Sequence, residues 1–345
     1  MLASAMFVQA ATTPFTFAIQ PGPHAVGFRV VLQYDFSRTY RGAVDVAGRL
    51  YRGEVARPVQ TLIWYPARKS ARPTVRFGDY LALFATEENF SPTPDASVSL
   101  VRQGEKDFDA DPSSSMWAVR DAMEEHGAWP VVIYAPSFTA PAFENADLCE
   151  YLASQGYVVI ASPDMGAHGR EMTMDLEGID AQARDISFLI GFARTLPQAN
   201  SSIAVAGYSW GGISNLFAAA KDERIKALVF LDGSARYFPK LVEDSKYVHP
   251  GEMSLPVIFF TQKDISLEAV VQFKRDVSRS VLNDMSHCDR IIVDMYGMSH
   301  GDFSSLFQRS PHFWNARPSD DYSGAKCRKA MVGWRDTRLR FSTPN

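Results

Sequence analysis

The chain has 345 residues and is 46% hydrophobic, which allows it to bury a large core. Its formal net charge is −4 and no run of Lys or Arg stands out, so neither nucleic acid nor an anionic membrane is an expected partner. No apolar stretch reaches the roughly 18 residues that span a bilayer, so integral membrane association is not expected.

The N-terminal segment has features of a secretory signal. Residues 1–14 are mostly apolar or small, and residues 8–10 resemble a signal-peptidase cleavage site. No Lys or Arg precedes Arg29, however, so the positive charge that starts such signals is missing. We expect residues 1–14 to be a signal remnant or a disordered start, and the protein to be secreted or periplasmic, with a cytoplasmic location as the alternative. Residues 15–345 are expected to form one domain.

Residues 15–66 are predicted to form antiparallel β-structure. Two segments, 28–34 and 59–64, are rich in β-branched and aromatic residues, and a polar hairpin region, 35–57, joins them. We expect these strands to form the antiparallel part of the central sheet.

Residues 67–128 are irregular and contain clusters of Ser, Pro and Asp at 91–97 and 107–115. One short helix is expected at 77–85. Because a long connection without regular structure is uncommon inside a domain, we interpret this region as an insertion that forms a partial cap over a pocket.

From residue 129 onward, short apolar segments alternate with helical patterns. Strands are predicted at 130–135, 157–161, 203–206, 227–231, 257–260 and 291–295. Helices are predicted at 146–155, 176–196, 213–220 and 267–280. Strands that are apolar throughout and separated by helices indicate an α/β fold, in which helices cover both faces of a mostly parallel central sheet.

A serine lies between two glycines in the sequence GYSWGG, residues 207–212. The apolar segment 203–206 precedes it and the small-residue helix 213–220 follows it, which is the strand–turn–helix setting of a G-x-S-x-G nucleophile elbow. Such a turn strains the serine backbone, and glycine at the flanking positions avoids collisions with neighbouring backbone. We therefore predict that Ser209 is a catalytic nucleophile rather than part of an ordinary glycine turn.

The base that removes the serine proton is predicted to be His300. A serine hydroxyl needs such a base, and the base needs a third group to orient it. Around this kind of elbow the chain order is serine, acid, histidine. His300 follows the predicted strand 291–295 after a short loop, whereas the other histidines precede Ser209, lie in proline-containing loops or come before the last strand.

Two aspartates are candidates for the acid. Asp232 ends the strand 227–231 and Asp264 follows the next strand. Ends of adjacent strands lie only about 5 Å apart, so either carboxylate can reach the histidine. Asp232 is preferred because it lies in an apolar context, and a buried carboxylate needs a partner. Asp264 follows a lysine and can belong to a solvated turn, while a purely structural Asp232 that caps a loop is the remaining alternative.

Two backbone N–H groups are expected to bind the oxyanion of the reaction. One belongs to Trp210, the residue after the nucleophile, and the other to the loop after the first core strand, residues 136–139, where Phe138 is the predicted donor. The neighbouring side chains of Tyr208 and Ser137 are candidates for lining the substrate pocket.

The three cysteines, Cys149, Cys288 and Cys327, do not form a disulfide framework. Cys149 lies in a helical pattern and is expected in the core, whereas Cys288 and Cys327 could pair in an oxidising compartment. Their spacing does not match a metal site, and we expect neither a metal ion nor an organic cofactor.

With these motifs, the chain resembles the α/β-hydrolase superfamily and, more narrowly, its branch of dienelactone-hydrolase-like proteins and platelet-activating-factor acetylhydrolases. The resemblance spans about residues 28 to 305 and rests on TLIWYP (61–66), WPVVIY (129–134), LASQGYVV (152–159), the elbow (207–212) and MSHGDF (298–303). It implies the α/β-hydrolase fold. In the acetylhydrolases the acid follows the strand after the elbow, at a Leu-Asp step that Leu231 and Asp232 match, so the resemblance supports Asp232.

The chain departs from these relatives at two points. The His-Gly pair that such enzymes often carry in the oxyanion loop is Pro136-Ser137 here, and the nucleophile is Ser209 where dienelactone hydrolases have a cysteine. The substrates of either group are therefore not carried over.

Together, these features predict a serine hydrolase that cleaves a small carboxylic ester by a Ser–His–Asp triad through an acyl-enzyme. A serine peptidase of the prolyl-oligopeptidase type is the alternative, because Gly-x-Ser-x-Gly-Gly also occurs there, although no propeller-like repeats precede the catalytic part. A non-catalytic binding protein with a hydrolase fold is a third interpretation. Such proteins usually lack a triad member, and here each role has a candidate.

Overall fold

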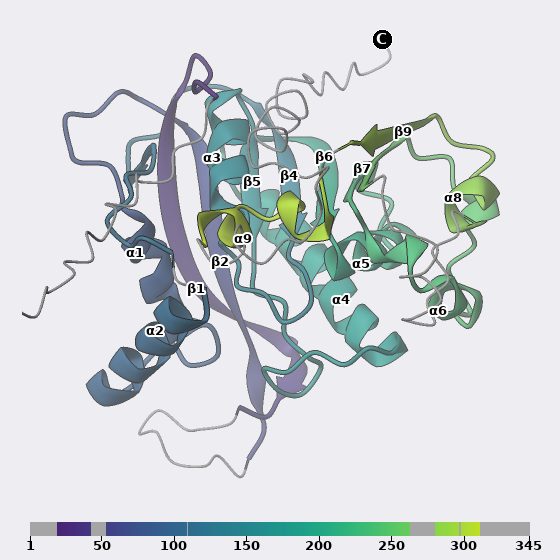
Figure 1. Ribbon diagram of the computed structural model, residues 1–345, viewed down its shortest axis with the longest axis horizontal. Helices are drawn as coiled ribbons and strands as arrows, with labels where there is room; N and C mark the ends of the chain where they lie inside the picture. Colours follow the sequence, from purple (N-terminus) through teal and green to yellow (C-terminus); the bar gives the residue numbers. More distant parts are fainter. Residues whose placement is uncertain (1–18, 43–52, 109, 263–279, 297, 311–345) are drawn as a thin grey trace, which may run out of the picture.

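The computed structural model describes the chain over residues 19–42, 53–108, 110–262, 280–296 and 298–310 (Figure 1). Four of the sequence predictions fall outside these residues: the N-terminal segment 1–14, most of the helix 267–280, Asp264 and Cys327.

The described strands form one sheet in the order β3-β1-β2-β5-β4-β6-β7-β8-β9 (Figure 1). Their bounds are β1 (Ala25–Tyr40), β2 (Val55–Ala67), β3 (Ala118–Arg120), β4 (Trp129–Ala135), β5 (Val158–Ala161), β6 (Ala199–Tyr208), β7 (Ile225–Leu231), β8 (Val257–Gln262) and β9 (Arg290–Met295). The β1–β2 and β2–β5 pairs are antiparallel, and the other pairs are parallel. The predicted α/β fold, with antiparallel N-terminal strands beside a mostly parallel sheet, is confirmed.

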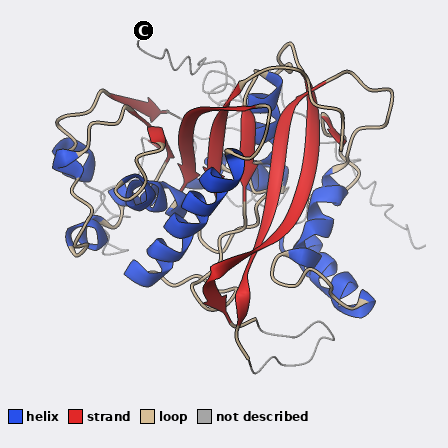
Figure 2. Cartoon of the chain, turned by 180° about the vertical axis from the view of Figure 1, so that it is seen from behind, coloured by secondary structure: helices blue, strands red, loops and turns tan. Residues whose placement is uncertain are grey.

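Helices cover both faces of the sheet, as the two opposite views in Figures 1 and 2 show. The described α-helices are α1 (Phe77–Leu81), α2 (Pro94–Phe108), α3 (Ala146–Ser154), α4 (Leu176–Ala193), α5 (Trp210–Ala219), α6 (Pro239–Glu243), α8 (Ser280–Asp284) and α9 (Ser305–Arg309). Short 3-10 helices are η1 (Ala82–Thr86), η2 (Ser234–Arg236), η3 (Pro250–Glu252) and η4 (His300–Phe303). Helices α3 and α9 pack on one face of the sheet, and α4 and α5 pack on the other.

Successive side chains of a strand point to opposite faces of the sheet, so an unbroken apolar run makes both faces apolar. In β4, Val131 and Ile133 pack in the hydrophobic cluster under α4 and α5, whereas Val132 and Tyr134 belong to the cluster under α3 and α9. Such strands must be covered on both sides, which is what the sequence pattern predicted. Cys149 of α3 is fully buried, as expected.

Strands β1 and β2 extend further than the sequence predicted. They pair over almost their whole length, with one register shift between Asp35 and Thr39. The described ends of the polar region 35–57 continue the strands, and some of their charged side chains are buried and paired. Arg57, for example, is buried and donates to both carboxylate oxygens of Asp185, at 2.8 and 2.6 Å.

The prediction that residues 67–128 contain a single short helix is wrong. The helix expected at 77–85 is present as α1 and η1, but α2 adds a helix of 15 residues, and β3 pairs with β1. The polar cluster before α2 starts a helix. Thr93 Oγ1 accepts a hydrogen bond from the N–H of Ala96 at 3.3 Å, and Pro94 occupies the first helical position.

Candidate active site

The nucleophile elbow forms where β6 passes into α5. Ser209, between them, has φ = 51°, a left-handed conformation that a non-glycine residue rarely adopts. A Cβ atom on Gly207 would lie 2.3 Å from the carbonyl oxygen of Gly211, and one on Gly211 would lie 2.1 Å from that of Ala135. Any side chain at these two positions would collide with neighbouring backbone, as the sequence motif predicted, so both must be glycine.

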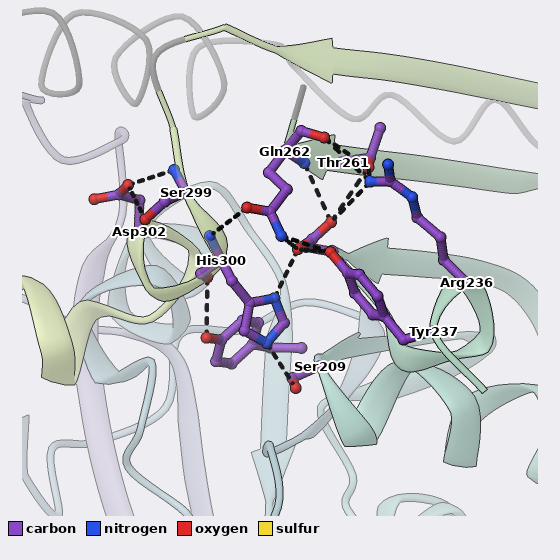
Figure 3. A network of polar contacts seen from close by, with 10 residues as sticks. Ser209, Arg236, Tyr237, Thr261, Gln262, Ser299, His300 and Asp302 are labelled. Atoms are coloured by element: carbon purple, nitrogen blue, oxygen red, sulfur yellow. Dashed lines mark hydrogen bonds and ion pairs between the residues drawn. The ribbon is translucent and has the colours of Figure 1, made fainter. Parts of the chain in front are cut away.

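His300 begins η4, the short turn that follows β9. A capping box closes this turn, since the carboxylate of Asp302 accepts hydrogen bonds from the N–H and the hydroxyl of Ser299, at 2.6 and 3.0 Å (Figure 3). The N–H of His300 donates to Gln262 Oε1 at 3.0 Å, and its carbonyl accepts from the Tyr208 hydroxyl at 3.0 Å. The position of the imidazole is thus fixed before any substrate binds.

The structure brings Ser209, His300 and Asp232 into one hydrogen-bonded chain. His300 Nε2 lies 2.9 Å from Ser209 Oγ, and His300 Nδ1 lies 2.6 Å from Asp232 Oδ2 (Figure 3). The side chain of His300 is 38% exposed and that of Asp232 is 0% exposed, so the ring connects a half-buried serine with a fully buried carboxylate. Of the two predicted acids, Asp232 lies against His300, and Asp264 lies outside the described residues.

Asp232 directly follows β7, has φ = 45°, and carries a carboxylate that is surrounded by donors. Besides His300, the groups that donate to it are Gln262 N (3.1 Å), Gln262 Nε2 (2.9 Å), Thr261 Oγ1 (3.2 Å) and Tyr237 Oη (2.8 Å). Arg236 adds a positive charge, with Nη1 3.7 Å from Asp232 Oδ1 (Figure 3). These contacts replace the water that a buried carboxylate loses.

Sequence reasoning missed Gln262 and Tyr237. Gln262 is the last residue of β8 and bridges two parts of the site, because its amide donates to Asp232 and accepts from the N–H of His300. It also donates to the hydroxyl of Tyr237 at 2.6 Å. The sequence did contain a signal, since a polar Thr-Gln pair directly follows the apolar run of β8, at the sheet edge where parallel strands end.

Replacing Gln262 with Leu is expected to lower kcat about 10- to 100-fold, because a displacement of about 1 Å in a catalytic group has effects of this size. In Gln262→Glu, the side chain can still accept from the N–H of His300, but it replaces the amide that donates to Asp232, so kcat is expected to fall as well. The measurement is kcat and KM for a p-nitrophenyl ester as a function of pH. Gln60→Leu is the matched control, since Gln60 is also buried and hydrogen-bonded but lies in β2. An equal loss of kcat in the control would contradict the positioning role of Gln262.

The two predicted oxyanion donors lie on adjoining segments. The loop after β4 packs against the start of α5, where Gly211 approaches the carbonyl groups of Ala135 and Pro136, and the rings of Phe138 and Trp210 meet edge to face at 5.6 Å. Within the described part of the chain, no hydrogen bond occupies the N–H of Phe138 or of Trp210. Both backbone donors are therefore available for a ligand at the elbow.

The structure gives Tyr208 and Ser137 uses other than lining a pocket. Tyr208 is buried, its ring packs 5.1 Å from that of His300, and its hydroxyl holds the carbonyl of His300. The hydroxyl and the N–H of Ser137 both donate to the buried carboxylate of Glu144. Both side chains thus support the site from within, and a role in lining a substrate pocket stays a prediction.

Among the described residues, no group of His, Cys, Asp and Glu side chains is arranged to hold a metal ion. No helix in this part of the chain combines the length and apolar character that crossing a membrane requires. Cys288 has a free thiol that donates to the carbonyl of Met253 at 3.0 Å, whereas Cys327 lies outside the described residues.

This arrangement is suited to nucleophilic acyl transfer. An imidazole between a hydroxyl and a buried carboxylate can take the hydroxyl proton as the oxygen attacks a carbonyl carbon, while the carboxylate stabilises the charged ring. Backbone N–H groups at the start of a helix can hold the negative oxygen that forms.

The chain is similar to known hydrolases. Residues 84–340 match the X-Pro dipeptidyl-peptidase (S15) family. A ferulic acid esterase from Streptomyces cinnamoneus has 16% sequence identity and a TM-score of 0.61, and the match covers 96% of this chain and 95% of the esterase. A dienelactone hydrolase-like promiscuous phosphotriesterase from metagenomic libraries has 11% identity and a TM-score of 0.47, over 90% of this chain and 97% of its own. No curated protein matches the sequence.

The family match confirms the α/β-hydrolase superfamily, and the esterase shares its fold, whereas the narrower resemblance to dienelactone-hydrolase-like proteins and acetylhydrolases stays a prediction. The family match spans most of the chain, including the elbow and the segments that carry the acid and the histidine. The chain therefore belongs to the X-Pro dipeptidyl-peptidase (S15) family, and it is a serine hydrolase of the α/β-hydrolase type.

Proposed function

We propose that the protein hydrolyses carboxylic esters, with Ser209 as the nucleophile, His300 as the general base and Asp232 as the acid that orients the base. The observation that carries this proposal is the unbroken hydrogen-bond chain from Ser209 Oγ through the imidazole to Asp232, at 2.9 and 2.6 Å. A half-buried serine held in this way, at a tight turn, is activated for attack on an acyl carbon.

The reaction proceeds in two steps. Ser209 Oγ attacks the acyl carbon while His300 Nε2 takes its proton, and the alcohol leaves with that proton, so that an acyl-enzyme remains. In the second step, water attacks the acyl carbon while His300 takes a proton from it. His300 then returns this proton to Ser209 Oγ as the acid product leaves. The N–H groups of Trp210 and Phe138 bind the oxyanion in both steps, and loss of one such donor typically lowers the rate about 10²- to 10³-fold.

The charges around the triad favour an ester over a peptide with a free N-terminus. A dipeptidyl peptidase must bind the α-ammonium group of its substrate, which calls for an available carboxylate near the nucleophile. Three carboxylates beside the triad, those of Asp232, Glu144 and Asp302, are buried and already accept hydrogen bonds, so they are engaged within the protein.

Aromatic side chains at the site favour an apolar acyl or alcohol group. The half-buried rings of Phe138 and Phe238 flank the buried ring of Trp210, at centroid distances of 5.6 and 5.7 Å. Sites for small organic ligands are mostly lined by such groups. Since a ferulic acid esterase shares this fold, esters of hydroxycinnamic acids are one class to test.

The second candidate function is removal of X-Pro dipeptides from peptides, which the family match over residues 84–340 favours. The same nucleophile and base would then attack an amide carbonyl, and His300 would protonate the leaving amine. Recognition of the substrate's N-terminus would then have to come from groups other than Asp232, Glu144 and Asp302.

A direct comparison of substrates tests the proposal. We expect saturable hydrolysis of p-nitrophenyl esters or methyl ferulate that is lost in Ser209→Ala, and a far lower kcat/KM for Ala-Pro p-nitroanilide. A higher kcat/KM for the anilide would establish the peptidase instead. A folded protein that acts on neither class, and that a fluorophosphonate does not label, would contradict both functions.

A further inference from the structure

The loop after β4 is held on both sides of Phe138 by buried carboxyl groups. The N–H of Ser137 donates to Glu144 Oε2 at 2.8 Å, and the N–H of Thr139 donates to Asp164 Oδ2 at 2.8 Å. The N–H of Phe138, between them, has no partner among the described residues. Carboxyl groups thus occupy the neighbouring donors and leave open the one that the proposed reaction uses.

Glu144 is built into this loop by more than one contact. Its carboxylate also accepts hydrogen bonds from the hydroxyl of Ser137 and, at 3.0 Å, from the hydroxyl of Tyr134 in β4. Because these donors come from the strand and from the loop that follows it, the carboxylate fixes the direction in which the loop leaves the sheet.

The same network reaches the segment that follows His300. Asn145 donates to the hydroxyl of Tyr134 at 2.7 Å and to the carbonyl of Phe303 at 2.9 Å, and it accepts from the N–H of Ser305 at 2.7 Å. The oxyanion loop and the histidine turn are therefore joined by one set of buried polar contacts, which keeps the two halves of the site in a fixed relation.

The other side of the loop is strained and held by several partners. Thr139 has φ = 55°, which is unfavourable for a β-branched residue. Besides its N–H bond to Asp164, its hydroxyl accepts from the N–H of Met172 and its carbonyl accepts from Arg170, both at 3.2 Å. Arg170 also pairs with Glu87, 2.8 Å away, so residues of the insertion reach the loop through this guanidinium.

Both carboxyl groups are unfavourable to bury. Desolvation raises the pKa of Glu144 to about 7 and the pKa of Asp164 well above its usual range. Apolar side chains of similar volume would avoid this penalty, but they could not accept a hydrogen bond from a loop N–H. The contacts with the loop offset part of this penalty, because each carboxyl group accepts a hydrogen bond from a loop N–H.

We infer that Glu144 and Asp164 are positioning residues for the oxyanion hole, which hold the N–H groups of Ser137 and Thr139 and so direct the N–H of Phe138 toward the oxyanion. This inference rests on the proposed ester hydrolysis. Because the oxyanion develops only on the way to the transition state, a misdirected donor lowers kcat and leaves substrate binding almost unchanged.

Deleting either acceptor tests the inference. Glu144→Ala and Asp164→Ala are each expected to lower kcat for a p-nitrophenyl ester about 10- to 100-fold, with KM nearly unchanged. Glu144→Gln and Asp164→Asn keep a carbonyl oxygen in the same place and are expected to recover most of this loss. Recovery by the amide variants distinguishes an acceptor role from a requirement for charge.

Glu150 in α3 provides the matched control. It is as buried as Glu144, at 1% exposure, and burial raises its pKa to about 7 as well. It accepts from the hydroxyl of Tyr80 at 2.7 Å and from the N–H of Trp117 at 2.6 Å, and these partners lie outside the oxyanion loop. Glu150→Ala is therefore expected to lower the free energy of unfolding while kcat stays at the wild-type value.

Two results would overturn the inference: folded alanine variants with wild-type kcat, or a Glu150→Ala variant that loses kcat to the same extent. Where an alanine variant does not fold, Glu144→Met and Asp164→Leu fill the same volume without a strong acceptor, and wild-type kcat in these would have the same consequence.

Labelling of Ser209 by a fluorophosphonate is measured in parallel. A wild-type protein that is neither labelled nor active refutes the proposed function, whereas an active wild type with unaffected variants refutes only the positioning role.

Discussion

Replacing Ser209 with Ala is expected to lower kcat for ester hydrolysis by about 10⁶-fold. The elbow places this hydroxyl 2.9 Å from His300 Nε2, and without it no acyl-enzyme can form. The residual rate would come from oxyanion binding and substrate orientation alone. The measurement combines steady-state kinetics with the mass of the intact protein after treatment with a fluorophosphonate, which should add one adduct to the wild type and none to the variant.

Ser214→Ala is the control for this experiment. Ser214 lies in the same helix, α5, is fully buried, and donates to the carbonyl of Trp210 at 3.3 Å. Its replacement removes a serine hydroxyl close to the elbow without touching the triad, so activity and labelling should be retained. If Ser209→Ala were as active as the wild type, or if the probe labelled a different residue, the nucleophile would have been misassigned.

The elbow could be predicted from the sequence because its determinants are local. Gly207 and Gly211 lie within two residues of Ser209, so the motif is visible in the sequence, although the backbone contact that requires Gly211 comes from Ala135 in β4. The position of His300 was predictable for a similar reason, since the last apolar strand of the pattern ends shortly before it and the order of the elements limits the alternatives.

The partners of Asp232 could not be predicted, because they depend on the register between two strands. Leu231 in β7 pairs with Phe260 in β8, and this register places the carboxylate beside Gln262. A shift by one residue would turn Gln262 to the opposite face of the sheet. The sequence could limit the acid to two aspartates at neighbouring strand ends, but only the folded chain places one of them against His300.

Burial of polar residues was the other feature that the sequence did not reveal. Glu144 and Asp164 follow apolar strands in segments that read as solvated loops, and in the structure both are buried by tertiary contacts. The polar composition of residues 91–97 likewise suggested an irregular segment, but in the structure these residues lead into α2, which begins at Pro94. The partners of these polar groups are single loop or strand residues, such as Ser137 for Glu144 and Thr139 for Asp164, or a helix end, and such contacts leave no periodic pattern in the sequence.

In Asp232→Asn, kcat is expected to fall by about 10⁴-fold. An amide has nearly the shape of the carboxylate, but one of its two positions must be an NH2 group. If that group faces His300, Nδ1 must become an acceptor, Nε2 then carries the hydrogen, and it can no longer take the proton of Ser209. If the amide is reversed, its NH2 group meets the N–H of Gln262, which lies 3.1 Å from Oδ1. Either orientation leaves a buried donor unpaired, so the free energy of unfolding should also fall, by about 1–3 kcal/mol.

Asp264→Asn is the comparison that decides between the two aspartates, because the sequence alone allowed either one to orient the histidine. We expect this variant to keep wild-type kcat, and urea denaturation of both variants separates a loss of catalysis from a loss of folded protein. If the large decrease appeared in Asp264→Asn instead, the acid would have to be reassigned. A folded Asp232→Asn enzyme with wild-type kcat would mean that the imidazole needs no carboxylate at this position. The short contact between Asp232 and His300 would then serve only to stabilise the fold, and the chain of hydrogen bonds could no longer be taken as the source of the activity.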